Sequence, residues 1–188
     1  YFPRQWRAAL VLLAASALAA PTFPQLTGRI VDNAGLLNAQ DRSAIEADLA
    51  AIEAKSTDQV VVVTLPSLQG YEIEDYGYQL GRHWGIGQKG KNNGVLLIIA
   101  PNERKVRIES GRRLEAHLTD AMSRIIIENA ILPKFRRGDV SGGIRDGVRD
   151  IKATIEGDAE GVKERARDRI GEHSEVDWIS LIMFGLWV

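Results

Sequence analysis

Hydrophobic residues recur along the chain at two spacings, one typical of helices and the other typical of strands. Apolar residues at i, i+4 and i+7 mark the buried side of an amphipathic helix. This spacing predicts helices over residues 39–56, 72–84, 119–133 and 139–155. Asn38 stands immediately before the first of these segments, where Asn is a favoured N-cap.

Three further segments have the composition of strands. Residues 58–68 and 94–100 are apolar almost throughout, which indicates strands buried on both faces. In residues 105–110 apolar and charged side chains alternate, and the turn 101–104 makes this half-exposed strand the hairpin partner of the one before it. Strands that alternate with helices, with one parallel crossover and one hairpin, predict an α/β domain with a mixed, mostly parallel sheet between helical layers.

The first 19 residues have the order of a secretory signal peptide. Arg4 and Arg7 precede an apolar run that ends in small residues. The alternatives are a core helix and a membrane span, but a span needs about 20 apolar residues and this run is shorter. We therefore expect residues 1–19 to be a signal peptide that takes no part in the fold.

The opposite end has the pattern of a membrane anchor. Within residues 176–188, Trp178 opens an uncharged run, and Trp is a typical residue of the membrane interface. The run covers only about 17 Å as a helix, so we expect the start of a truncated transmembrane helix; a packed terminal helix is the alternative. Residues 158–175 hold ten charged side chains among eighteen and are expected to form a stalk, or else a solvated helix.

Together the two ends predict an exported protein. A cleavable signal followed by a stop-transfer helix leaves the domain between them in the periplasm, anchored to the inner membrane. Without Arg4 and Arg7 the basic residues fall from 24 to 22 against 25 acidic ones, a formal charge of −3, and nothing here indicates nucleic acid. The absence of Cys fits an exported protein without disulfides and equally fits a reducing compartment.

The stretch "GIGQKGKN" at residues 85–92 has the glycine spacing G-x-G-x-x-G of a nucleotide-binding loop. That motif binds phosphate only when a strand precedes the loop and a helix follows it. Here a predicted helix precedes the loop and a predicted strand follows it, and Asn92 stands where a Walker motif has Ser or Thr. We therefore expect no nucleotide at this loop.

Five stretches of the chain carry a family resemblance. They are "IVDNAGLL" at 30–37, "QVVVVTLPSLQGYEIEDYG" at 59–77, "HWGIGQKGKNNGVLLIIAPNERKVRIESGRRLE" at 83–115, "LTDA" at 118–121 and "ILPKFRRGDVSGGI" at 131–144. In this order and spacing they resemble the TPM domain family, and we assign residues 26–157 to such a domain. The resemblance implies a three-layer α/β/α fold outside the cytoplasm, with divalent metal binding and acid phosphatase activity in some members. The family usually has Gly where this chain has Arg113. The resemblance therefore does not establish the backbone conformation of the turn "GRRLE" or any anion binding there.

Five polar residues lie at strand ends or helix starts: Asp32, Asn92, Asn93, Glu115 and Asp120. Ligands of an open α/β sheet bind outside the carboxyl ends of its strands, and the resemblance favours the five as one set. Oxygen donors with no Cys suit a hard cation such as Ca²⁺ or Mg²⁺. Each residue also has a structural interpretation: Asp32 as an Asx turn, Asp120 as an N-cap and the asparagines as a turn.

The chain has no Cys and lacks the D-x-D-x-[ST] and G-x-S-x-G nucleophile motifs. A phosphatase would need metal-activated water, with Arg112 or Arg113 holding the phosphate; a solvated turn is the alternative for these arginines. The sequence thus predicts a membrane-tethered domain that binds Ca²⁺ or Mg²⁺ and serves as an interaction or assembly module for envelope proteins. The alternative is a metal-dependent acid phosphatase. In either case the glycine loop is expected to turn oxygens toward Asp32 and Asp120.

Overall fold

Four strands form a central sheet in residues 20–170, the part of the chain that this computed structural model describes. Their order in the sheet is β1 (Ile30–Asp32), β2 (Gln59–Thr64), β3 (Gly94–Ala100) and β4 (Lys105–Ser110). β1 with β2 and β2 with β3 are parallel pairs, and β4 runs antiparallel to β3. The predicted mixed, mostly parallel sheet and its hairpin are therefore confirmed.

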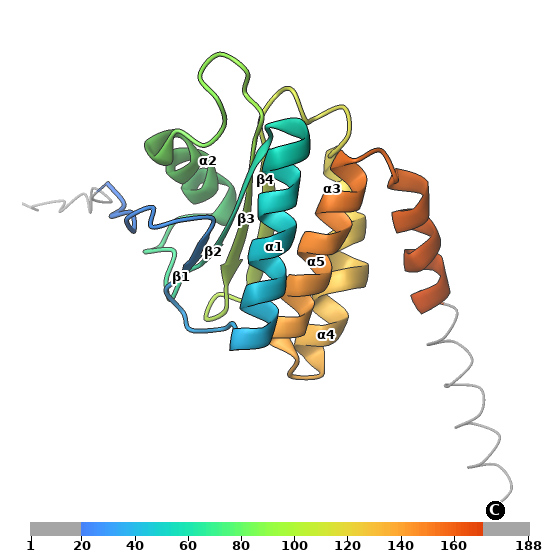
Figure 1. Ribbon diagram of the computed structural model, residues 1–188. Coiled ribbons are helices and arrows are strands. Elements are labelled where there is room, and N and C mark those ends of the chain that lie inside the picture. The colour runs from blue at the N-terminus through green and yellow to red at the C-terminus, as the bar shows by residue number, and fades with distance from the viewer. Residues whose placement is uncertain (1–19, 171–188) are drawn as a thin grey trace, which may run out of the picture.

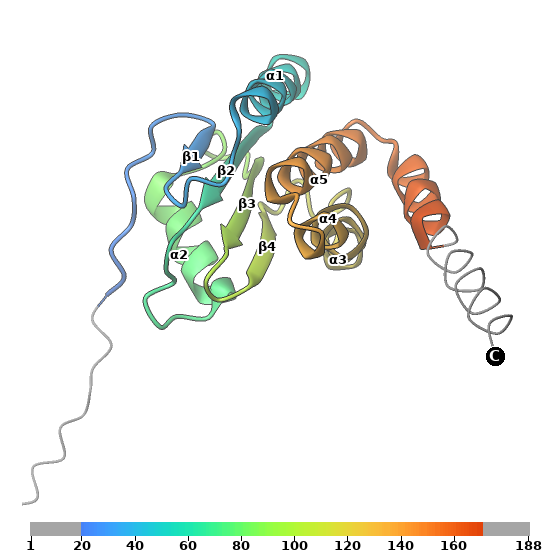
Figure 2. The same cartoon turned by 90° about the horizontal axis from the view of Figure 1, so that it is seen from below.

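Helices cover both faces of the sheet. α2 (Ile73–Trp84) lies on one face, and α1 (Ala39–Ser56), α3 (Asp120–Ile126), α4 (Leu132–Arg136) and α5 (Val140–Ile155) lie on the other (Figures 1 and 2). Because alternate residues of a strand point to opposite faces, each face has its own core. Val60 and Val62 join the core beneath α1 and α5, and Val61 and Val63 join the core beneath α2. The three-layer α/β/α architecture is confirmed.

The helix ends follow from local sequence. The Asn38 side chain accepts a hydrogen bond from the Asp41 N–H at 2.8 Å and begins α1, as predicted. The Asp139 side chain accepts one from the Gly142 N–H at 3.0 Å and begins α5 in the same way. Gly85 ends α2 in the left-handed conformation, with φ of 61°, which a residue without a side chain adopts at little cost.

Three of the predicted elements need correction. β1 was not predicted, because three residues are too few for a periodic pattern. β2 ends at Thr64, before Pro66, so residues 65–68 belong to a loop. The helix predicted over residues 119–133 does not stop at Pro133.

Pro133 lies in the first turn of α4. A short π-helix, η1 (Ile127–Ile131), joins α3 to α4. The wider turn of a π-helix offsets the chain, so the proline is accommodated and the helical segment reaches Arg136.

The charged residues beyond α5 are helical over 159–170 (red in Figure 1). Val162 and Ala166 are buried against the domain, and the Arg165 guanidinium lies 3.3 Å from the buried carboxylate of Asp150. One side of this helix is therefore packed, whereas a solvated helix would expose every side; its role as a stalk stays a prediction.

The predicted signal peptide at 1–19 and membrane segment at 176–188 lie outside the described residues. Within residues 20–170, no helix is both long enough and apolar enough to cross a membrane.

Candidate functional site

Asp32 ends β1 at the carboxyl end of the sheet, and hydrogen bonds within the domain occupy its carboxylate. One oxygen accepts from the Leu36 N–H at 2.9 Å and the Thr64 hydroxyl at 2.5 Å, and the other accepts from the Leu37 N–H at 3.1 Å. Burial raises the pKa of Asp32, but these hydrogen bonds and the charge of Arg42 outweigh burial and hold the pKa below its usual value. Asp32 therefore stabilises the turn after β1.

Asn93 is fully buried at the other end of the sheet. Its side-chain oxygen accepts from the Gln88 N–H at 2.7 Å, and its amide donates to the Thr57 carbonyl at 2.8 Å. These bonds tie the glycine loop to the end of α1, and both polar ends of the Asn93 side chain are thereby satisfied. Asn93 holds the loop in place rather than facing a ligand.

The sheet separates the two residues. Asp32 is level with Thr64, whereas Asn93 precedes Gly94, which is level with Gln59. At about 3.3 Å a residue, the separation along the strands is roughly 20 Å. The prediction that the five residues form one set is wrong, because Asp32 ends a strand while the asparagines precede a strand parallel to it.

Two other predicted residues, Asp120 and Arg113, do not line the pocket that holds the remaining ones. Asp120 is exposed in the first turn of α3, and the N-cap there is Thr119, whose hydroxyl accepts from the Met122 N–H at 3.1 Å. Arg113 is also exposed, and its φ is not in the left-handed region. The loss of the family's glycine at this position therefore causes no backbone strain.

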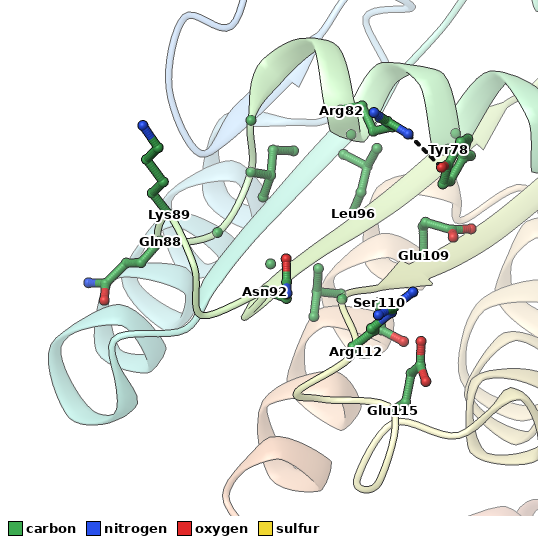
Figure 3. Close-up of a pocket in the computed structure, with 18 of the residues that line it drawn as sticks. Tyr78, Arg82, Gln88, Lys89, Asn92, Leu96, Glu109, Ser110, Arg112 and Glu115 are labelled. Carbon is green, nitrogen blue, oxygen red and sulfur yellow. Dashed lines mark hydrogen bonds between the residues drawn. The ribbon is translucent and has the colours of Figure 1, made fainter.

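The remaining three predicted residues, Asn92, Arg112 and Glu115, line one pocket of about 820 Å³ at the amino end of β3. Its other walls are the glycine loop 85–90, one side of α2 and the end of β4 (Figure 3). Asn92, Arg112 and Glu115 are all exposed to solvent. The structure therefore brings Asn92 of the loop together with Glu115 and Arg112 of the turn after β4. Asn92 and Glu115 are candidate cation ligands, and Arg112 is a candidate anion ligand.

Close backbone approach explains three of the glycines around this pocket. A Cβ at Gly87 would lie 2.8 Å from the Gly94 nitrogen, and one at Gly94 would lie 2.6 Å from the Ile86 carbonyl oxygen. A Cβ at Gly111 would lie 2.2 Å from the Asn92 carbonyl oxygen. The loop and the turn after β4 both press against the start of β3, so the glycines serve packing at a point where the loop enters a strand.

The pocket carries side chains of both charges. The Arg82 guanidinium donates to the Tyr78 hydroxyl at 2.7 Å and lies 5.5 Å from the centre of its ring, on the α2 side (Figure 3). Arg112 lies opposite, between Ser110 and Glu115, and Lys89 points away from the pocket (Figure 3). In residues 20–170, neither arginine has a carboxylate within 4 Å. The pocket therefore offers free donors to an anion as well as oxygens to a cation.

The oxygen donors fit only a weakly held, hydrated cation. Glu115 and Asn92 supply one carboxylate and one amide, and the Glu109 carboxylate is already bound by Arg107 at 2.7 Å. Nowhere in the described part of the chain do three or more His, Cys, Asp or Glu residues gather closely enough to hold a metal. Mg²⁺ keeps several waters when it has one or two carboxylates, and Ca²⁺ accepts neutral oxygens, so both fit such a set.

Sequence reasoning missed the α2 side of this pocket. Gly77, Gly81 and Gly85 recur at intervals of four and all line the hollow, together with Tyr78 and Arg82, although a Cβ at Gly77 would lie 2.5 Å from the Ile98 side chain. A Cβ at Gly81 would meet nothing within 4 Å. Gly77 and Gly81 inside the helix were therefore the available signal, since a helix has no need of glycine in its interior.

Comparison with known proteins agrees with this architecture. The profile of the TPM domain matches residues 30–154. The solution structure of the N-terminal domain of a protein from P. gingivalis is 36% identical, with a TM-score of 0.63, over 70% of this chain and 83% of that one. Comparison with curated protein sequences gives no significant match.

Two more distant structures share the fold alone. The N-terminal domain of the cg2496 protein from Corynebacterium glutamicum is 20% identical, with a TM-score of 0.54, over 73% of this chain and 86% of that domain. The BA42 protein from Bizionia argentinensis is 18% identical, with a TM-score of 0.55, over 63% of this chain and 81% of that protein.

Proposed function

The chain belongs to the TPM domain family, and from this premise we propose that its domain binds a divalent cation in the pocket at the amino end of β3 and serves as an interaction or assembly module of the cell envelope. The observation that carries the proposal is that Asn92, Glu115 and Arg112 all line that pocket. Asp32, Asn93 and Asp120 are not part of the proposed site, because the first two are satisfied within the domain and the third lies outside the pocket.

In the proposed site, Glu115 binds the cation directly, Asn92 supplies a neutral oxygen, and water completes the coordination. With so few charged ligands we expect Ca²⁺ to dissociate at about 10⁻⁵ to 10⁻³ M, in the range of sensors and extracellular modules. At 100 times its dissociation constant, the ion stabilises the folded domain by about 2.7 kcal/mol through mass action.

Thermal melts of the full chain in detergent test the cation site, first in EDTA and then in millimolar Ca²⁺ or Mg²⁺. We expect the melting temperature to rise with either ion, and Glu115→Gln to remove the rise. Asp120→Asn is the matched control, because it neutralises a carboxylate outside the pocket and should leave the rise intact. An unchanged melting temperature in both cations, or a rise that survives Glu115→Gln, refutes the site.

The envelope location rests on the patterns at residues 1–19 and 176–188. A reporter fusion placed within residues 158–170 tests it. Alkaline phosphatase should be active there and green fluorescent protein should not fluoresce. Exported alkaline phosphatase folds to an active enzyme, whereas exported green fluorescent protein does not become fluorescent. The reverse result overturns both the export and the tether.

A second candidate function is a metal-dependent acid phosphatase, and the pair Arg82 and Arg112 across the same pocket favours it. Two guanidinium groups beside a cation can hold a phosphate ester while metal-bound water attacks it. Turnover of p-nitrophenyl phosphate at pH 5 to 7 that is lost in EDTA and in Arg112→Ala would support this function. No turnover above the blank with either cation would reject it.

A further inference from the structure

β4 is an edge strand, and its outward hydrogen-bonding groups can be identified from the ladder. The Gly111 N–H donates to the Gly94 carbonyl at 2.8 Å, so Gly111 faces β3. Successive residues of an antiparallel strand face alternate sides, so the N–H and C=O of Lys105, Arg107 and Glu109 also point to β3. Those of Val106, Ile108 and Ser110 therefore point away from the sheet.

No strand in the described part of the chain pairs with this outer side, because the sheet ends at β4. No hydrogen bond within residues 20–170 uses the outward backbone groups of Val106, Ile108 or Ser110. The opposite edge differs, because β1 has only three residues, and short edge strands discourage pairing. β4, with six residues, is long enough to be a template.

A hollow flanks β4 on each face. On the α2 face, the pocket already described reaches Glu109 and Ser110 near the end of the strand (Figure 3). On the α4 face, a second hollow of about 620 Å³ lies beside the start of the strand, with Val106, Leu132 and Phe135 in its wall. A strand added along β4 would therefore point alternate side chains toward two different hollows, one polar and one apolar.

The charges around this edge define the partner. Arg104 and Arg136 line the apolar hollow, and both are exposed. Together with Arg82 and Arg112 at the polar one, they lie more than 4 Å from every carboxylate of residues 20–170. The polar hollow also holds Glu109, which is paired with Arg107, and Glu115. Its two arginines outnumber this one unpaired carboxylate, so the guanidinium groups at the two hollows attract carboxylates of a partner, since opposite charge guides docking.

We propose that the free edge of β4 binds an extended segment of a partner protein as a fifth strand, and that this segment alternates apolar and acidic residues. Backbone hydrogen bonds to Val106, Ile108 and Ser110 supply affinity, and the two hollows supply specificity. Apolar side chains enter the hollow beside α4, and acidic side chains meet the arginines. The inference rests on the proposed role as an interaction module but does not require the cation.

A fluorescein-labelled octapeptide in which Leu and Glu alternate is the probe, titrated with the full chain in detergent by fluorescence anisotropy. We expect saturable binding at micromolar to millimolar protein, and slower amide exchange at Val106, Ile108 and Ser110 by NMR. The same peptide N-methylated at alternate residues cannot complete a ladder, so it should bind at least tenfold more weakly. Equal binding of both peptides overturns the proposal, as does no binding.

Variants of the strand give a second test. Val106→Pro removes one outward N–H while leaving the bonds to β3, because proline is tolerated at edge strands where its nitrogen faces solvent. It should weaken binding at least tenfold, whereas Val106→Ile keeps the N–H and an apolar branched side chain and should change binding less than twofold. Ser110→Pro repeats the test if Val106→Pro does not fold. Full binding by a folded proline variant, or β4 already occupied by a second copy of the chain, overturns the proposal.

The cation serves as a separate readout. Peptide binding that fails while Ca²⁺ still raises the melting temperature rejects the β4 proposal alone. A melting temperature indifferent to cations, with the peptide still bound at β4, rejects the cation site alone.

Discussion

At the carboxyl end of the sheet, hydrogen bonds from Leu36, Leu37 and Thr64 occupy both oxygens of Asp32, whereas at the amino end Asn92 and Glu115 line an open pocket. Both ends place polar side chains in loops next to strands. The difference shows that position beside a strand does not make a ligand. A polar group is available to a ligand only when the fold has not already satisfied it.

The largest effect on stability is expected from Asp32→Ala. The substitution removes three hydrogen bonds from a partly buried carboxylate, two of them to backbone N–H groups, and should lower the free energy of unfolding by about 3 kcal/mol. Urea unfolding measures this. In Asp120→Ala, where the carboxylate is exposed, the loss should stay below about 1 kcal/mol. Equal effects of the two substitutions would contradict the contrast between the ends.

Gly111→Ala should have the next largest effect. Its Cβ would lie 2.2 Å from the Asn92 carbonyl oxygen, and backbone cannot move aside as a side chain can. We expect a loss of about 2 kcal/mol, typical of overpacking, together with weaker cation binding as Asn92 shifts. Gly28→Ala meets nothing within 4 Å and serves as control. A Gly111→Ala protein as stable as the Gly28→Ala protein would show that the turn is not pressed against β3.

Gly81→Ala should act in the opposite direction. In the interior of α2 a Cβ at this position meets nothing, so the substitution should raise the free energy of unfolding by about 1 kcal/mol through helix propensity. Because the new methyl group enters the pocket, we expect binding there to weaken while stability rises. Gly77→Ala is the contrast, since its Cβ would lie 2.5 Å from the buried Ile98 side chain, and its protein should be less stable than the Gly81→Ala protein. A gain in stability with unchanged binding would place the ligand away from α2.

The smallest effect concerns pH, because burial and hydrogen bonding act on the pKa of Asp32 in opposite directions. The net pKa in the folded state lies below the unfolded value of about 3.9, so the contribution of Asp32 is complete above that value and is lost as pH falls through the folded pKa. The difference in unfolding free energy between wild type and Asp32→Ala should be constant from pH 7 to 5 and narrow below about pH 4. A difference that narrows above pH 5 would indicate a raised pKa instead.

Much of the fold was predictable from the sequence because its signals are local. The spacing of Ile45, Leu49 and Ile52 marked α1, Asn38 and Asp139 marked helix starts, and the apolar run of β3 marked a strand buried on both faces. Each signal reflects the backbone geometry of one element, which neighbouring residues determine among themselves. β1 and the continuation past Pro133 escaped prediction because pairing with β2 and a π-turn, not local propensity, produce them.

The candidate site was predictable only in part. Asn92, Arg112 and Glu115 do share a pocket, but Tyr78, Arg82 and the glycines of α2 that line it were missed. Asp32 was grouped with Asn92 and Asn93, although Asp32 lies where β1 ends and the asparagines lie where β3 begins, at the opposite end of the sheet. That separation depends on β1, β2 and β3 being parallel. The sequence did not reveal this, because β1 is too short to be recognised as a strand.

By itself, the sequence determined the order of helices and strands, the burial of the central strands and membership of the TPM domain family, because periodicity, caps and motifs are carried by residues close together in the chain. Only the tertiary structure decided which polar groups are satisfied and which face solvent. In the folded domain Glu115 is exposed to solvent, whereas both carboxylate oxygens of Asp32 accept hydrogen bonds. The fold also brings α2 and the end of β4 to one pocket. These outcomes depend on hydrogen bonds and close contacts between residues distant in sequence, and such contacts exist only once the layers are packed.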